Sequence, residues 1–144
     1  MPINKRKHLR TPIEIGILPP AMMTLFKPFF HEPFEVHIRD LSAGGMKLTS
    51  PEVLPLFFDF GLEFHLPGTE LIQAKAKAVH QLKTDDGYDI GVLFTEIEDS
   101  VRDLLNALGT DYNSCEDRIR AEEREVCRES CRFLLLCQKN QKTF

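Results

Sequence analysis

The period of the hydrophobic pattern is the feature that most constrains the fold of this chain, because it changes once, near residue 96. Before that point, apolar and polar residues alternate in short runs bounded by proline and glycine, which is typical of half-buried β-strands. The runs occupy residues 11–17, 34–38, 46–48, 61–66, 72–78 and 88–94. Six short strands at roughly even spacing predict a mainly β protein, a small antiparallel barrel or sandwich.

After the change, apolar residues recur at helical spacing. One helical face would carry Ile97, Val101, Leu104, Leu105 and Leu108. Gly109 is placed to end this helix as its C′ residue. Ser114 and Asp117 have the spacing of a capping box, which predicts a second helix over about 115–138.

The length of 144 residues suits one domain with an appendage. We expect a barrel domain at 1–110 with a flexible basic N-terminal arm, followed by a C-terminal helical extension at 111–144. No apolar run approaches the roughly 20 residues that cross a bilayer. No apolar segment typical of a signal peptide follows the basic N-terminus, so we expect a cytoplasmic protein.

The net charge of -4 argues against general nucleic-acid binding, which depends on neutralising phosphates. The charge is unevenly distributed along the chain. Residues 1–50 carry seven Lys or Arg against four Asp or Glu, whereas residues 51–114 carry four against twelve. An anionic partner is therefore expected at the N-terminal end.

Residues 18–33 contain four prolines and no clear period, which predicts a loop. This loop would be unusually apolar, since it contains Met22, Met23, Phe26, Phe29 and Phe30. Two alternatives are open for it: packing on the barrel, or packing on a partner.

Two arginines precede the first expected strand, in the sequence RKHLR. A solvated basic terminus is the common role of such a cluster. However, the guanidinium groups of Arg6 and Arg10 could also bind phosphate oxygens, or the O6 and N7 of a guanine, in bidentate fashion.

The loop after the second expected strand, DLSAGG, supplies complementary groups. The carboxylate of Asp40 can accept the N1 and N2 donors of guanine, and Ser42 can donate or accept. Gly44 and Gly45 permit close backbone approach or a positive φ. A connecting turn is the simpler interpretation, but with the arginines this loop would complete a guanine nucleotide site.

These two motifs, in this order, resemble the PilZ domain family, whose signature is RxxxR followed by [D/N]xSxxG. Arg6 and Arg10 match the first element; Asp40, Ser42 and Gly45 match the second. The similarity continues through GLEFHLPG, YDIGVLF and the first expected helix, covering about residues 4–108. The resemblance implies bacterial origin and a six-stranded antiparallel β-barrel followed by a C-terminal helix.

The resemblance also implies binding of the second messenger cyclic di-GMP at those five residues. Binding in that family orders the arginine segment and changes a surface offered to a protein partner. We therefore expect a signal-transduction receptor with an unidentified protein partner, no cofactor and no membrane span.

We expect no catalytic residues and no enzyme activity, because no nucleophile elbow or phosphate-cradling glycine loop is present. His37, His65 and His80 fall at polar strand positions, which predicts surface histidines without a metal. The four cysteines, at 115, 127, 131 and 137, have no standard metal spacing. We expect them to be reduced thiols and mainly small buried residues.

Two other functions remain open. The chain could be a ligand-independent PilZ-fold interaction module acting through residues 18–33 or the last helix. It could instead be a thiol or metal sensor that uses the C-terminal cysteines. The apolar sequence CRFLLLC also allows a homo-oligomer through the C-terminal helix.

Overall fold

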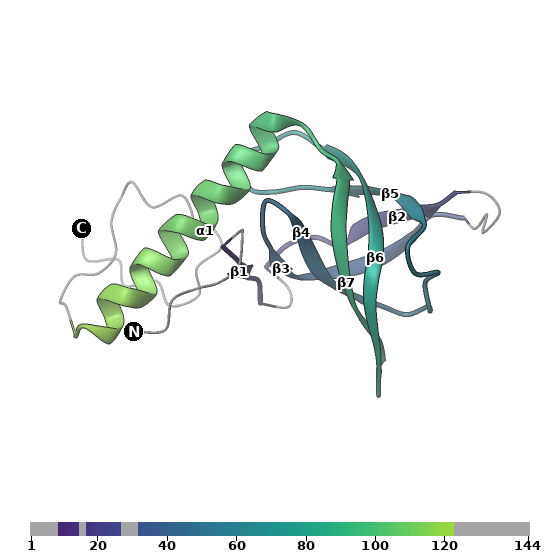
Figure 1. Ribbon diagram of the computed structural model, residues 1–144, viewed down its shortest axis with the longest axis horizontal. Coiled ribbons are helices and arrows are strands. Elements are labelled where there is room, and N and C mark those ends of the chain that lie inside the picture. The colour runs from purple at the N-terminus through teal and green to yellow at the C-terminus, as the bar shows by residue number, and fades with distance from the viewer. Residues whose placement is uncertain (1–8, 15–16, 27–31, 123–144) are drawn as a thin grey trace.

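Six antiparallel strands close into a barrel, and one helix extends from it (Figure 1). The computed structural model describes residues 9–14, 17–26 and 32–122, so Arg6 and residues 123–138 of the expected second helix lie outside the described residues. The elements are β1 Thr11–Pro12, β2 Ala21–Leu25, β3 Phe34–Leu41, β4 Gly45–Ser50, β5 Asp59–Phe64, β6 Ile72–Thr84, β7 Gly87–Glu96 and α1 Asp99–Arg120.

The strand order explains how the barrel closes. The strands pair in the order β3-β2-β5-β6-β7-β4, and β4 then pairs with β3. Short β1 is an additional strand on the end of β3, where Thr11 pairs with Leu41 and Pro12 with Asp40. The predicted six-stranded antiparallel barrel is therefore confirmed.

The alternation read from the sequence gives the inner face of the barrel. Inward side chains such as Val36, Leu48, Phe60, Leu62 and Ile90 are at most 1% exposed. The outward neighbours in these strands are polar or partly exposed. The alternation at 34–38, 46–48, 61–66, 72–78 and 88–94 thus predicted β3 to β7 correctly.

The prediction that residues 18–33 form only a loop was wrong, because β2 lies inside this segment. Met22 pairs with Glu35 of β3 and with Glu63 of β5, so β2 is an integral barrel strand. Ala21, Met23 and Leu25 point into the core. The segment therefore packs on the barrel as part of its wall, although Phe29 and Phe30 lie outside the described residues.

The strand predicted for residues 11–17 is correspondingly shorter than expected. Only Thr11–Pro12 forms a strand in the described part, and Ile13 continues the association by donating its N–H to the carbonyl of Arg39 at 2.8 Å. The six barrel strands are thus β2 to β7, and the first predicted strand is outside that set.

The helical face predicted from the sequence is confirmed in α1. Leu105 and Leu108 are buried in the core, and Val101 and Leu104 pack against it. Beyond these residues the helix extends away from the barrel (Figure 1). In the part of the chain that the structure describes, no helix is long and apolar enough to span a membrane.

Gly109 does not end the helix, and Ser114 does not begin a second one. α1 runs through both positions to Arg120 and across residue 110, so the boundary between the barrel domain at 1–110 and the extension at 111–144 stays a prediction. Ser114 instead accepts a hydrogen bond from Arg118 Nη1 at 2.8 Å within the helix.

A packing constraint explains why a glycine occupies position 109 inside the helix. A Cβ on Gly109 would lie 2.8 Å from the carbonyl oxygen of Leu9 and 3.1 Å from its Cβ. The N-terminal segment therefore lies directly against the helix backbone at this point. Asn113 completes the contact, because its Nδ2 donates to the carbonyl of Arg10 at 3.3 Å and to that of Gly109 at 2.7 Å.

Another glycine permits the barrel to close. Gly45 begins β4 opposite Leu93 of β7, and a Cβ on Gly45 would lie 2.0 Å from the carbonyl oxygen of Val92. A side chain at this position would push β4 and β7 apart. Gly91, also in β7, differs because a Cβ there would meet only the His80 Cβ at 3.6 Å, an ordinary contact.

We predict that Gly45→Ala lowers the free energy of unfolding by at least about 2 kcal/mol, because overpacking of this kind costs about 1–3 kcal/mol and here it displaces backbone. Gly91→Ala is the matched control and should change it by less than about 0.5 kcal/mol. Urea denaturation measures both. Equal effects would contradict the role assigned to Gly45.

A second prediction concerns the contact between α1 and the N-terminal segment. Alanine normally stabilises a helix interior by about 1 kcal/mol relative to glycine. Gly109→Ala should fail to stabilise the protein, since the new Cβ displaces Leu9. At the exposed position Asn106, the Asn106→Ala control should raise the free energy of unfolding by about 0.5 kcal/mol. A gain of about 1 kcal/mol from Gly109→Ala would show that the two segments do not pack closely.

Candidate ligand-binding site

The predicted site residues that the structure describes gather around one hollow on the outer face of the barrel. It has a volume of about 310 Å³, and we call it the β4–β7 hollow. Its lining comprises Arg10, Asp40, Ser42, Gly45, Met46, Lys47, Val79, His80, Leu82, Asp89, Gly91, Val92 and Leu93. Thus Arg10 and the second motif, separated by 30 residues of sequence, meet at one place.

Arg10 and Asp40 face each other across the hollow. The distance from Arg10 Nη1 to Asp40 Oδ2 is 3.8 Å. The Arg10 side chain is 49% exposed, so this ion pair is worth no more than about 1 kcal/mol. Such a weak pair leaves the guanidinium available to an anion that offers stronger, bidentate hydrogen bonds.

Local structure fixes both partners of this pair. Arg10 precedes β1 and its carbonyl is bound by Asn113 of α1. Asp40 lies near the end of β3, where its Oδ1 accepts the backbone N–H of Lys47 at 3.1 Å. The second carboxylate oxygen therefore points toward Arg10 and the hollow.

Ser42 and Gly45 form the tight hairpin between β3 and β4. The N–H of Ser42 donates to the Gly45 carbonyl at 2.8 Å. The Ser42 hydroxyl donates to the same carbonyl and accepts the N–H of Gly45, both at 3.2 Å. These bonds occupy the hydroxyl and hold the turn in shape.

The sequence-based explanation of Gly45 needs one correction. Its φ is not among the positive values, which occur only at Gly68 and Gly87 among the described glycines. The close backbone approach that the structure shows at Gly45 is that of the Val92 carbonyl, and the approach of a ligand there stays a prediction. Gly45 therefore shapes the site through strand pairing.

A row of residues across four strands forms the floor of the hollow, and the sequence analysis missed part of it. Asp40 pairs with Lys47, Lys47 with Gly91, and Gly91 with His80. Since Gly91 has no side chain, it leaves open space between Lys47 and His80. The strand register, which a sequence pattern does not give, is what brings Lys47 and His80 to the site.

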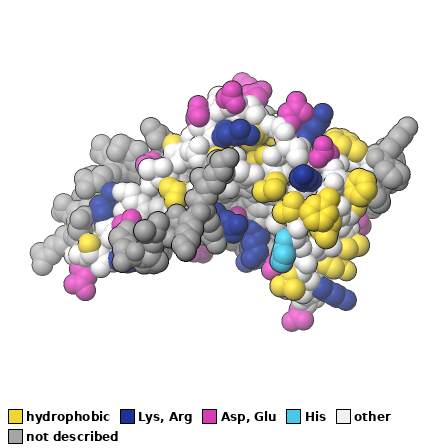
Figure 2. Space-filling model, in the orientation of Figure 1, with side chains coloured by type: hydrophobic (Ala, Val, Ile, Leu, Met, Phe, Trp, Pro, Cys, Tyr) yellow, Lys and Arg dark blue, Asp and Glu magenta, His cyan; other side chains and the backbone are white. Residues whose placement is uncertain are grey.

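The predicted surface positions of His37, His65 and His80 are confirmed, since all three are exposed. Figure 2 shows a histidine beside basic side chains on one face of the barrel. Hydrophobic side chains adjoin them, and those that line the hollow include Leu82 and Leu93, 59% and 46% exposed. The hollow thus combines cationic donors, the two carboxylates of Asp40 and Asp89, and an apolar wall.

The cysteine alternative is mostly outside the described residues. Cys115 is half-buried on α1, while Cys127, Cys131 and Cys137 lie beyond the described range. Within the described ranges, no three His, Cys, Asp or Glu side chains are grouped so as to hold a metal ion. The role of the cysteines stays a prediction.

Solved structures share this fold at low sequence identity. The inhibitor of motility MotI/DgrA of Bacillus subtilis matches with a TM-score of 0.60 and 16% identity, over 85% of this chain and 55% of that one. YcgR of Escherichia coli, in complex with c-di-GMP, matches with a TM-score of 0.58 and 16% identity, over 83% of this chain and 50% of that one. The chain therefore spans about half the length of these two proteins.

The PilZ domain of Escherichia coli YcgR, solved with c-di-GMP, matches over almost its whole length. The TM-score is 0.55 and the identity 18%, with 83% of this chain and 99% of that domain covered. A search of curated protein sequences found no match. The PilZ domain family model matches residues 4–109, which include both motifs, the barrel and the first half of α1. By this match, the chain belongs to the PilZ domain family.

Proposed function

We propose that this protein is a cyclic di-GMP receptor and that the β4–β7 hollow is its binding site. The observation that carries the proposal is the meeting of Arg10 with Asp40, at 3.8 Å, in a hollow that Ser42 and Gly45 also line. Two motifs that are unrelated in sequence position supply complementary groups to one place. PilZ domain structures with c-di-GMP support the same ligand.

The arginines bind the anionic part of the ligand in this proposal. Arg10 exchanges its exposed ion pair with Asp40 for charge-assisted bonds to a phosphate or to the O6 and N7 of a guanine. Arg6, four residues earlier, adds a second guanidinium. The lining residue Lys47 supplies a further positive charge.

Asp40 recognises the guanine edge. Its Oδ2, released from Arg10, accepts the N1 and N2 donors of the base, while Oδ1 keeps its bond to the N–H of Lys47. Ser42 and Gly45 hold the hairpin that presents this carboxylate. Because the Ser42 hydroxyl is already committed to the turn, its contribution to affinity is mainly positional.

The module binds and does not catalyse. Its output is a change at a protein-interaction surface in a bacterial cytoplasmic signalling pathway, with the barrel domain at 1–110 as receptor and residues 111–144 as an extension. The partner would recognise the liganded form.

Calorimetric titration tests the proposal. Cyclic di-GMP should bind the full chain with micromolar or tighter affinity, whereas GTP and cyclic di-AMP should bind at least tenfold more weakly. Arg10→Ala should weaken binding at least tenfold, since hydrogen bonds to charged groups contribute about 1.5–3 kcal/mol each. Its thermal midpoint without ligand should fall by no more than about 4 °C, because the lost ion pair is worth at most about 1 kcal/mol.

Arg39→Ala is the matched control for Arg10→Ala. Arg39 is adjacent to Asp40 in sequence, but it donates to Thr49 and does not line the hollow. Its replacement should change affinity less than threefold. Equal losses from the two variants, or no binding by the original chain, would overturn the proposed site and favour the ligand-independent interaction module.

Asp40→Ala tests base recognition separately. We expect it to reduce the affinity for cyclic di-GMP at least tenfold and the weak affinity for cyclic di-AMP by less than threefold, because adenine lacks the N1 and N2 donors. The selectivity measured by calorimetry should therefore fall. Equal losses for both ligands would contradict a guanine-reading carboxylate.

A further inference from the structure

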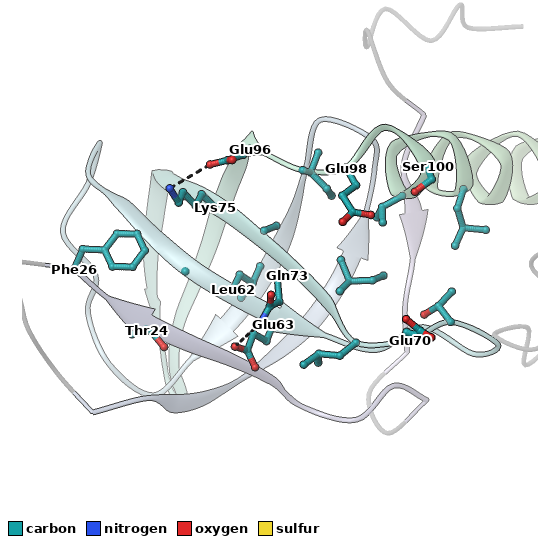
Figure 3. Close-up of a pocket in the computed structure, with 18 residues that line it drawn as sticks. Thr24, Phe26, Leu62, Glu63, Glu70, Gln73, Lys75, Glu96, Glu98 and Ser100 are labelled. Carbon is teal, nitrogen blue, oxygen red and sulfur yellow. Dashed lines mark hydrogen bonds and ion pairs between the residues drawn. The ribbon is translucent and has the colours of Figure 1, made fainter.

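A second hollow in the described part of the molecule is larger than the β4–β7 hollow. It is a groove of about 860 Å³ that runs along β2, β5 and β6 to the first turns of α1. Figure 3 shows Phe26 at one end and Glu98 and Ser100 toward the other. We call it the acidic groove. It shares no lining residue with the β4–β7 hollow.

The groove has an apolar floor that is open to solvent. Phe26 is 40% exposed and Leu71 is 45% exposed, and they line the same groove, whose rim is polar, which is typical of an interaction surface. Val101 and Leu104 of α1 continue this surface. Gly61 keeps the floor low, since it has no side chain beneath the Phe26 ring, whose Cζ lies 3.5 Å from where a Cβ would be.

The rim of the groove is acidic. The charged lining residues are Glu63, Glu70, Glu96, Glu98 and Lys75. The single lysine is paired with Glu96 at 3.2 Å, as the dashed line in Figure 3 marks. Figure 2 shows further acidic side chains over the beginning of α1.

The fold uses two of these four carboxylates, since Glu96 pairs with Lys75 and Glu63 accepts a hydrogen bond from Gln73 at 3.3 Å. Glu70 and Glu98 make no ion pair with any residue that the structure describes. Glu98 occupies the N-cap position of α1, yet its side chain makes no capping hydrogen bond. Both carboxylates therefore remain available to cations from outside the described part of the chain.

We propose that the acidic groove docks a basic amphipathic segment of a partner protein. Apolar side chains of that segment contact Phe26, Leu71 and Val101, while its lysines or arginines pair with Glu70 and Glu98. Helix-in-groove recognition has this chemistry, with apolar anchors at helical spacing and charges at the rim. The open apolar floor supplies contact area, and the uncompensated acidic rim selects for a cationic partner.

This inference is independent of cyclic di-GMP, because none of the groove residues belongs to the proposed ligand site. It also gives the apolar segment at residues 18–33 two roles. Met23 fills the core, whereas Phe26, directly after β2, faces the groove.

Fluorescence anisotropy with the full chain tests the proposal. The probe is a labelled 15-residue helical peptide with leucines on one face and lysines on the other. A peptide with the same leucines and glutamates in place of the lysines is its control. We expect micromolar binding of the lysine peptide, at least tenfold weaker binding of the glutamate peptide, and weakening by added salt.

Groove variants localise the binding. Gly61→Leu fills the floor, and Glu70→Lys combined with Glu98→Lys reverses the charge of the rim. Each should weaken the binding of the lysine peptide at least tenfold. The surface control Glu35→Lys, on β3 outside the groove, should change its affinity less than threefold. All variants should bind cyclic di-GMP as the original chain does, which verifies their folding; if that ligand fails to bind at all, an unchanged thermal midpoint serves the same purpose.

The outcomes separate the alternatives. If the groove variants lose binding of the lysine peptide and Glu35→Lys does not, docking of a basic partner is supported. Absence of binding below about 1 mM, equal binding of the two peptides, or equal loss in Glu35→Lys overturns it. Light scattering gives a further test. If the original chain has twice the mass of one chain and Gly61→Leu has the mass of one chain, the proposal is overturned, since the occupant of the groove would then be a second copy.

Discussion

The fold depends on the pairing of β4 with β7, because without it the ring of six paired strands would be open. Gly45 makes the closure possible by leaving room for the carbonyl of Val92. The same pairing places Lys47 opposite Gly91 and so creates the floor of the β4–β7 hollow. One steric constraint therefore determines both the barrel and the shape of the candidate site.

The N-terminal segment is connected to the site through α1. The helix packs Leu105 and Leu108 into the core, and its next turn presents Gly109 and Asn113 to the N-terminal segment. Arg10 thus reaches Asp40 from a backbone that is held by the helix and by β1. This arrangement leaves the guanidinium half exposed while its backbone is fixed.

Much of the fold could be predicted from the sequence, because outward and inward residues alternate clearly in β3 to β7. The number of barrel strands was right, although its first member was misplaced. The prolines that flank Ala21–Leu25 and the adjacent Met22 and Met23 obscured the alternation of β2. Membership of a closed barrel is decided by pairing with β3 and β5, which local patterns do not contain.

The helix and the site show the same limit. Glycine often ends a helix, but Gly109 lies inside α1. The glycine is needed there because a side chain would collide with Leu9, which is 100 positions earlier in the sequence. Arg10 and Asp40 were predicted because each belongs to a motif whose chemistry is evident. Lys47 and His80 carry no such motif, and only the register across β4, β7 and β6 brings them to the hollow.

We propose that the β4–β7 hollow binds cyclic di-GMP through Arg10 and Asp40. The most direct measurement is a crystal structure of the full chain with this ligand. We expect a phosphate or guanine acceptor within about 3.2 Å of the Arg10 guanidinium and a guanine edge at Asp40 Oδ2, with the 3.8 Å ion pair broken. A ligand bound elsewhere, with the pair between Arg10 and Asp40 intact, would contradict it.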